Sequence, residues 1–288
     1  MDGLILLNKP AGITSFAAVA AIRRTMGVKR CGHTGTLDPM ATGLLPILTG
    51  RATKLSDYLL AGDKAYRAEV QFGVATDSFD LCGRVTDVGG RIPTWAEIEA
   101  VLPEFIGPQK QTPPAFSAIK QHGVPLYKLA RKGQSIDLPV RDIEIYGIDP
   151  IGYAEGRFSF DVRCSKGTYI RSLCVDLAKR LGTIGCMSAL CRTETMGFSI
   201  TQSIDLDRAK QCLQEGDTSF ILPPKAALPY KSYCPPAFFA ALLAHGQAVD
   251  ARKLPACPDG PVWVEEENRI LGIGKRLEDG RFKIITHL

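Results

Sequence analysis

The stretch from Gly32 to Leu45 contains the residue types in this chain that could do chemistry. It holds a single carboxylate, Asp38, among glycines, small hydroxyl residues and a histidine. An aspartate that precedes a proline in a glycine-rich loop is often a turn-former, and on local grounds this interpretation is the stronger. The alternative is a nucleophile or base directed at a bulky substrate. Residues elsewhere in the chain must decide between the two.

Three more residues carry groups that such a carboxylate needs at a sugar. Tyr66 begins a strand-like alternation in a charged segment, and Arg171 lies on the first turn of a predicted helix, off its apolar stripe. Lys9 follows the first apolar run and adds an ammonium. Together these groups can hold a base and stabilise charge at a sugar. The simpler interpretations are a core tyrosine, a surface arginine and a turn lysine.

The charge of the chain is distributed unevenly, although its net value is only +5. Basic residues predominate in 1–54 and 110–141, whereas acidic residues predominate in 55–109. Two basic regions separated by an acidic one can create a directed field toward a polyanion. Solvated surface lysines explain the same pattern equally well. Charge alone therefore leaves a nucleic-acid partner open.

The chain contains nine cysteines and four histidines. The cysteines form no C-x-x-C pair and the histidines lack zinc-ligand spacing, so we expect free thiols and no metal. The apolar run Leu4–Leu7 is too short for a signal sequence, and no other run approaches membrane-spanning length. These observations predict a cytoplasmic protein that is not embedded in a membrane.

Helical and strand-like periodicities interleave along the chain. An apolar run at Gly3–Leu7 and alternating patterns at Tyr66–Phe72 and Phe158–Cys164 predict strands. Helical spacing follows the hydroxyl residues Thr14–Ser15 and the turn at Ser165–Thr168. The pattern predicts an α+β fold with a mixed, mainly antiparallel sheet and flanking helices.

Five prolines between Pro223 and Pro236 predict a linker. We therefore expect a larger domain over residues 1–228 and a small module over residues 229–288. The module shows one helical stretch followed by short strand-like segments, which predicts a β-rich accessory domain.

Five motifs resemble, in their order, the bacterial TruB-type tRNA pseudouridine synthases. They are Asn8–Gly12, Gly32–Leu45, Asp63–Arg67, Ser117–Lys120 and Lys166–Ser172. The Gly-His-Thr-Gly-Thr-Leu-Asp-Pro block of the second motif is highly specific. The resemblance spans about 2–198 and implies an enzyme that isomerises a uridine in the T-loop of tRNA, at position 55, to pseudouridine.

The resemblance also implies a role for individual residues. Asp38 matches the catalytic aspartate, Arg171 the arginine that pairs with it, and Tyr66 the base-stacking tyrosine. The implied substrate-binding residues are His33, which occupies space vacated by flipped nucleotides, Tyr169 and Leu190, which line the uracil pocket, and Lys9 of the first motif.

A basic insertion over about 108–141 is the predicted RNA-gripping segment. Its cations Lys120, Lys128, Arg131 and Lys132 are expected at the RNA backbone, with Phe116 and Tyr127 interleaved for stacking. The C-terminal module faintly resembles a PUA-type RNA-binding domain.

The chemistry that the resemblance implies fits this set of residues. Pseudouridine formation breaks the N1–C1′ bond of uridine, rotates the uracil and joins C5 to C1′, without net redox change. We therefore expect neither a metal nor any other cofactor. An adjacent cation should keep Asp38 ionised. The expected partner is tRNA, with no obligate protein partner and a monomeric state.

Two alternatives remain at this stage. One is the RNA-guided pseudouridine synthase subunit, which shares the catalytic core but works with partner proteins and usually carries lysine-rich tails. The other is a non-catalytic tRNA-binding chaperone. Asp38 argues against the chaperone, because an anionic side chain that faces a polyanion lowers affinity.

Overall fold

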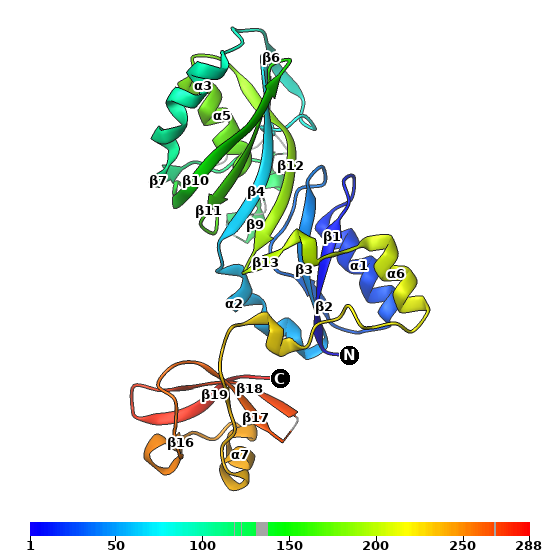
Figure 1. The fold of residues 1–288 in the computed structure, drawn as a ribbon, viewed down its shortest axis with the longest axis vertical. Coiled ribbons are helices and arrows are strands. Elements are labelled where there is room, and N and C mark those ends of the chain that lie inside the picture. The colour runs from blue at the N-terminus through cyan, green and yellow to red at the C-terminus, as the bar shows by residue number, and fades with distance from the viewer. Residues whose placement is uncertain (118, 122, 131–137, 268) are drawn as a thin grey trace.

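The computed structural model describes residues 1–117, 119–121, 123–130, 138–267 and 269–288 (Figure 1). Within these ranges, ten strands form one sheet whose main path runs β14-β1-β3-β12-β4-β11-β10-β7, with β13 on β12 and β2 on β3. Its strands are β1 (Gly3–Lys9), β2 (Cys31–His33), β3 (Thr42–Thr49), β4 (Lys64–Phe72), β7 (Gly107–Gln111), β10 (Arg141–Ala154), β11 (Arg157–Cys164), β12 (Gly185–Thr195), β13 (Phe198–Ser199) and β14 (Ile204–Asp205).

Most neighbours in this sheet are antiparallel. Among the described strands of this sheet, the parallel pairs are β1 with β14 and β3 with β12. The α-helices of this part are α1 (Ser15–Met26), α2 (Ser56–Leu60), α3 (Trp95–Val101), α4 (Leu126–Ala130), α5 (Ile170–Arg180) and α6 (Leu206–Gln214). Two-stranded sheets pair β5 (Val74–Thr76) with β6 (Val85–Val88) and β8 (Lys120–Gln121) with β9 (Val124–Pro125). The predicted α+β fold with a mixed, mainly antiparallel sheet is thus confirmed.

Strand β4 at the centre of the sheet follows directly from its sequence. Tyr66, Ala68, Val70 and Phe72 alternate with polar residues, and these four side chains are buried. Strand β11 repeats the pattern and pairs with β4 in antiparallel register, so that Phe160 lies opposite Ala68. A two-residue period places all these apolar side chains on one face, which the helices then cover.

Helices α1 and α5 begin near the predicted positions. Thr14 caps α1, because its hydroxyl accepts a hydrogen bond from the Ala17 amide, and Gly27 ends the helix with φ +64°. Helices often end at a glycine in the left-handed conformation, because glycine has no side chain that would be strained there. Helix α5 starts at Ile170 and buries an apolar stripe against the sheet.

The stretch Gly32–Leu45 is only partly a loop, which differs from the sequence-based description. Residues 31–33 and 42–49 form β2 and β3, which pair antiparallel with His33 opposite Ile47. Strand β3 is buried along nearly its whole length, so its apolar run shows no alternation that would reveal a strand. The part of the motif outside regular secondary structure is reduced to residues 34–41.

A second sheet follows the proline-rich stretch. It runs β15 (Ser232–Tyr233), β17 (Val262–Glu266), β18 (Arg269–Arg276), β19 (Arg281–His287) and β16 (Val249–Asp250), with α7 (Ala237–Ala244) packed against it. The stretch predicted as a linker contains a short 3-10 helix at Pro224–Ala227 and strand β15. The division at residue 228 stays a prediction. No helix in the described ranges is long and apolar enough to cross a membrane.

Trp263 of β17 joins this second sheet to the first part of the chain. It is fully buried in an apolar cluster that contains Leu4 and Leu48 from the large sheet and Ile273 from β18. Its indole Nε1 donates a hydrogen bond of 3.2 Å to the Leu228 carbonyl. The two sheets therefore share a packed apolar contact.

Replacing Trp263 by alanine should remove the centre of this contact. We expect the free energy of unfolding to fall by about 3–5 kcal/mol, as for other fully buried large aromatic side chains. Urea denaturation monitored by circular dichroism measures it, and Phe238→Ala, at a residue 69% exposed, is the control. A loss below about 1 kcal/mol would show that the contact contributes little.

Candidate active site

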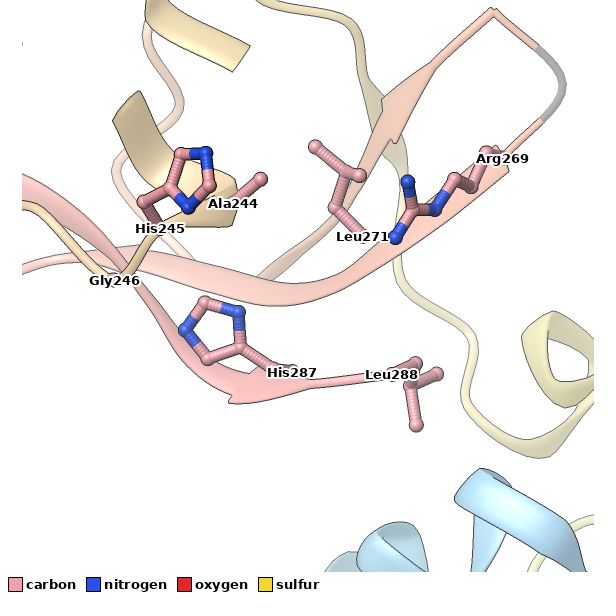
Figure 2. A pocket seen from close by; sticks show the side chains of 7 residues that line it. All are labelled: Ala244, His245, Gly246, Arg269, Leu271, His287 and Leu288. Carbon is pink, nitrogen blue, oxygen red and sulfur yellow. The ribbon is translucent and has the colours of Figure 1, made fainter. Parts of the chain in front are cut away.

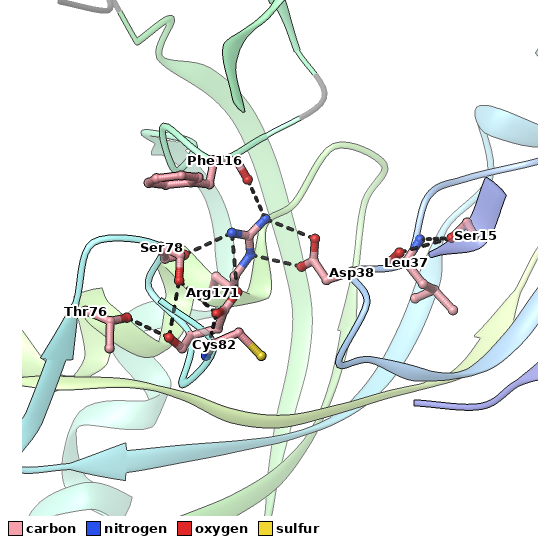
Figure 3. A network of polar contacts seen from close by, with 9 residues as sticks. Ser15, Leu37, Asp38, Thr76, Ser78, Cys82, Phe116 and Arg171 are labelled. Atoms are coloured by element: carbon pink, nitrogen blue, oxygen red, sulfur yellow. Dashed lines mark hydrogen bonds and ion pairs between the residues drawn. The ribbon is translucent and has the colours of Figure 1, made fainter. Parts of the chain in front are cut away.

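The loop that carries Asp38 is fixed to the protein on both sides of the aspartate. Before it, the Ser15 hydroxyl of α1 accepts from the Leu37 amide at 2.8 Å and donates to the Leu37 carbonyl at 3.0 Å (Figure 3). After it, the Pro39 carbonyl accepts from the Gly12 amide at 2.8 Å. Asp38 is therefore held at a defined position, with its side chain 30% exposed.

Arg171 is the direct partner of Asp38. Its Nε lies 2.9 Å from Asp38 Oδ2, and its Nη2 lies 3.2 Å from Asp38 Oδ1. The two contacts form a bidentate ion pair, a geometry that fixes the direction of the carboxylate. Arg171 is itself only 5% exposed, so it is not the surface arginine of the simpler interpretation.

Backbone carbonyls from two other segments complete the surroundings of Arg171. Nη1 donates to the Ser78 carbonyl at 2.9 Å, and Nη2 donates to the Phe116 carbonyl at 2.9 Å (Figure 3). Arginine suits this role because its guanidinium presents several donors in one rigid plane. The guanidinium thus ties helix α5 to three separate loops.

Asp80 is a member of this network that the sequence analysis missed. Its Oδ2 lies 3.5 Å from Arg171 Nη1, and its Oδ1 accepts hydrogen bonds from the Ser78 hydroxyl and the Cys82 amide. Asp80 is 8% exposed and places a second carboxylate on the guanidinium. The sequence contains a signal, because acidic and small residues are frequent in the turn over 77–83. This pattern did not identify Arg171 as the partner of Asp80.

The charge of Asp38 reflects opposing influences. Burial raises the pKa of its carboxyl group, Arg171 lowers that pKa, and Asp80 raises it again. The net direction is upward from the ordinary value. The adjacent cation was expected to keep Asp38 ionised, and it does act in this direction, but burial outweighs it. A raised pKa makes the carboxylate a stronger base than an exposed aspartate.

Tyr66 and Leu190 lie next to each other on one face of the sheet. Strands β4 and β12 pair antiparallel, with Tyr66 opposite Arg192 and Leu190 opposite Ala68. Tyr66 is 7% exposed and belongs to the main apolar core, and Leu190 is 9% exposed. Both predicted site residues therefore also serve as core residues, and Arg192 is a second neighbour that the sequence analysis missed.

Tyr169 stands directly before helix α5. Gln111 of β7 holds its backbone from both sides, because the side-chain amide donates to the Tyr169 carbonyl at 3.0 Å and its oxygen accepts from the Tyr169 amide at 2.8 Å. Burial raises the pKa of the Tyr169 phenol, which Arg171 partly offsets. The clamp fixes the chain two residues before Arg171, so Tyr169 lies near the ion pair.

Lys9 is placed differently from the prediction that it binds substrate. It is fully buried, and its Nζ donates to the carbonyls of Pro10, Ile13 and Pro39. Burial lowers the pKa of this ammonium to about 8, against the attraction of Asp38. The reason is that β1 ends beneath the Asp38 loop, where the ammonium satisfies carbonyls of two turns. Lys9 thus supports the loop from within the protein.

His33 lines a cavity of about 390 Å³ together with Lys29, Arg30, Thr53 and Ser56, among others. Its Nδ1 is buried and has no hydrogen-bond partner among the described residues. Burial lowers the pKa of His33, and the Arg192 charge acts in the same direction. A neutral imidazole at this place fits the predicted wedge better than an acid catalyst.

The predicted RNA-gripping cations are described only in part. Lys128 is exposed on helix α4, and Lys120 lies in β8. Arg131 and Lys132 lie outside the described residues. In the described ranges, no group of three or more His, Cys, Asp or Glu side chains is arranged to hold a metal ion.

A separate cavity of about 320 Å³ lies in the C-terminal sheet (Figure 2). His245, Arg269 and His287 line it together with Leu271. Asp38 lines neither this cavity nor the one beside His33. The Asp38 carboxylate therefore lies outside both cavities, with its pair to Arg171 partly open to solvent.

This chain is similar to known proteins over nearly its whole length. Residues 23–170 match the family model described as "TruB family pseudouridylate synthase (N terminal domain)". The chain belongs to the TruB family. The tRNA pseudouridine synthase B of Pseudomonas putida strain F1 is 40% identical over 289 residues, which cover 98% of this chain and 93% of the relative. The tRNA pseudouridine synthase B of Trichormus variabilis is 42% identical over 282 residues, which cover 96% and 94%. The predicted family is confirmed.

Solved structures share the TruB-family fold at lower identity. A crystal structure of a Cbf5–Nop10–Gar1 complex contains a chain that is 25% identical, with a TM-score of 0.70 over 96% of this chain and 78% of that one. The crystal structure of an archaeal box H/ACA Nop10–Cbf5 complex gives 24% identity and a TM-score of 0.71 over 99% and 85%.

Replacing Asp80 by asparagine should separate its effect on the reaction rate from its effect on the pKa of Asp38. Losing a charged partner of Arg171 should slow uridine isomerisation about tenfold or more, because bonds to charged groups contribute about 1.5–3 kcal/mol. A carboxylate-dependent rate falls as pH drops through the pKa of Asp38. Asp80 raises that pKa, so the fall should move to lower pH in the variant.

Single-turnover rates across a pH series measure both effects, with Asp87→Asn, at an exposed position of β6, as the control. A shift of the acidic limb to higher pH would contradict the assignment.

Proposed function

We propose that this protein isomerises the uridine at position 55 in the T-loop of tRNAs to pseudouridine, with Asp38 as the reacting carboxylate. The bidentate pair between Asp38 and the buried Arg171 is the observation that carries the proposal. The names of relatives about 40% identical over nearly the full length support tRNA as the substrate.

Asp38 is suited to a reaction at the sugar or base of a nucleotide. Its two oxygens are directed by Arg171, and the loop on either side is fixed through Leu37 and Pro39. The carboxylate attacks the sugar or base, or it removes a sugar proton, and both roles need a fixed, ionised oxygen. The N1–C1′ bond breaks, the uracil turns and C5 joins C1′, while C5 loses a proton and N1 gains one. The reaction therefore needs no external oxidant or reductant.

The substrate base must leave the RNA stack to reach Asp38. Base flipping costs a few kcal/mol, and the cost is smallest where pairing is already weak, as in a structured loop. His33 lies on β2 directly before the Asp38 loop, which suits the role of filling the vacated space. Tyr66 then stacks on the detached uracil, and Leu190 and Tyr169 close the base pocket.

The protein is proposed to act in the cytoplasm as a monomer without an obligate protein partner. The structure records all nine cysteines as free thiols, which supports a reducing compartment. Higher identity to proteins named tRNA pseudouridine synthase B than to the Cbf5 chains favours independent action over an RNA-guided subunit. Exposed Lys128 supports the proposed contact of the insertion with the RNA backbone.

Replacing Asp38 by asparagine should abolish conversion of a synthetic T-loop hairpin. The amide keeps the size of the side chain but loses the charge, so the single-turnover rate should fall by about a thousandfold or more. Hairpin affinity should be retained or slightly increased, because a negative charge is removed. Release of tritium from a hairpin labelled at uridine C5 measures the rate.

Asp207→Asn is the matched control, because the Asp207 side chain is 92% exposed. Comparable conversion by Asp38→Asn would exclude Asp38 as the reacting group. Binding of the hairpin by the unaltered protein without any conversion would favour the non-catalytic chaperone.

A further inference from the structure

Arg192 of β12 is one of the largest fully buried side chains of the protein. Its Nε donates to the Leu44 carbonyl at 2.7 Å, and its Nη2 donates to the Gly35 carbonyl at 3.2 Å. Among the described residues, no carboxylate acts on its charge. Burying a cation without an anionic partner is far more costly than burying an apolar side chain of that size. This cost calls for a functional reason.

The sheet register places Arg192 beside Tyr66. The two residues are direct partners across the antiparallel pair of β12 and β4, so their side chains lie on the same face. Burial raises the pKa of the Tyr66 phenol, and the neighbouring Arg192 guanidinium acts against that rise. Cys164 and Asp38 also act on the phenol, and both raise its pKa. Arg192 is thus a cation beside Tyr66 on the same face of the sheet.

Two glycines of the Gly32–Leu45 motif lie against Arg192. Gly43 has φ +99°, and a Cβ there would overlap the backbone carbonyl oxygen of Arg192. Gly35 has φ +117°, and a Cβ there would lie 3.3 Å from Arg192 Nη1. Both backbones adopt left-handed conformations that side chains disfavour. Gly43 therefore lets β3 approach the backbone of β12, and Gly35 leaves room for the Arg192 guanidinium.

We propose that Arg192 is a positioning residue for Tyr66, which it anchors to the backbone of the Asp38 loop so that the tyrosine ring is held in place against the substrate base. The inference rests on the proposed function, since it assigns Tyr66 to the uracil. Carbonyls of Gly35 and Leu44 fix two donors of the guanidinium, and the register of β12 on β4 places Tyr66 beside it. The nucleophile loop and the stacking ring are then set relative to each other by one side chain.

A double-mutant cycle with Arg192→Gln and Tyr66→Phe tests this coupling. Each single variant should lower the single-turnover rate on the T-loop hairpin by about tenfold to a hundredfold, with hairpin affinity within about threefold of the unaltered protein. The double variant should be no more than about threefold slower than the worse single variant, because both changes remove the same contact. Arg163→Gln, at an exposed position of the neighbouring strand β11, should leave the rate unchanged.

A double variant whose loss equals the product of the single losses would overturn the proposal and leave Arg192 with a structural role only. Unaltered activity in Arg192→Gln would overturn it as well. Should Arg192→Gln fail to fold, the same cycle is run with Arg192→Lys, which keeps the charge and one donor group. Arg192→Lys should lower the rate less than Tyr66→Phe does. The two changes together should show the same non-additive coupling.

A spectroscopic measurement keeps this test separate from the proposed function. With tyrosine labelled by ¹³C at Cζ, the Tyr66 resonance is assigned by its absence in Tyr66→Phe. It should shift in Arg192→Gln (or Arg192→Lys) and stay in place in Arg163→Gln. An unshifted resonance would contradict the Arg192 contact whatever the catalytic activity, whereas absent hairpin conversion by the unaltered protein would contradict the proposed function alone.

Discussion

The buried guanidinium of Arg171 is the constraint around which the candidate site is arranged. It contacts two carboxylates, Asp38 and Asp80, and two backbone carbonyls, those of Ser78 and Phe116. A cation that is 5% exposed is stable only when such partners replace its lost water. The need to satisfy it therefore draws three loops together at the start of helix α5, and Asp38 becomes one of the oxygens that neutralise the charge.

The sheet supplies the rigid support for this arrangement. Strands β4 and β12 present Tyr66, Leu190 and Arg192 on one face, and the clamp of Gln111 on Tyr169 ties β7 to the beginning of α5. Beneath the Asp38 loop, the ammonium of Lys9 donates to the carbonyls of Pro10, Ile13 and Pro39. Asp38 thus lies on a short loop that is held from below, from the side and through its own charge, which is the preorganisation that catalysis by a single carboxylate requires.

The sequence predicted those parts of the fold that depend on the pattern of neighbouring residues. The alternation in β4 and β11, the Thr14 cap of α1 and the start of α5 were all predictable, because each is determined by neighbouring residues. Strand β3 was not, because burial on all sides removes the alternation that marks a strand. The TruB family was predicted from ordered motifs and confirmed, whereas the roles of individual residues stay predictions.

The parts of the site that escaped prediction depend on contacts between distant segments. Asp38 and Arg171 are 133 residues apart, and only the ordered motifs linked them. Asp80 and Arg192 lie outside the quoted motifs, and their importance follows from the loop and sheet register that bring them to Arg171 and Tyr66. Lys9 was predicted from the sequence to bind substrate, yet the structure shows it fully buried. Burial of a charged residue is a tertiary property, so a local pattern could not reveal it.

The central claim is that the shape and the several donors of the Arg171 guanidinium, beyond its charge, make Asp38 reactive. Arg171→Lys tests it most directly, because lysine keeps the charge but loses the planar set of donors that grips the carboxylate. The measurement is the single-turnover rate of pseudouridine formation on the T-loop hairpin, made on a variant whose folding and hairpin affinity are verified. The account predicts a folded protein with hairpin affinity within about threefold and a rate lower by about a hundredfold or more. A rate within about threefold of the unaltered protein would contradict it.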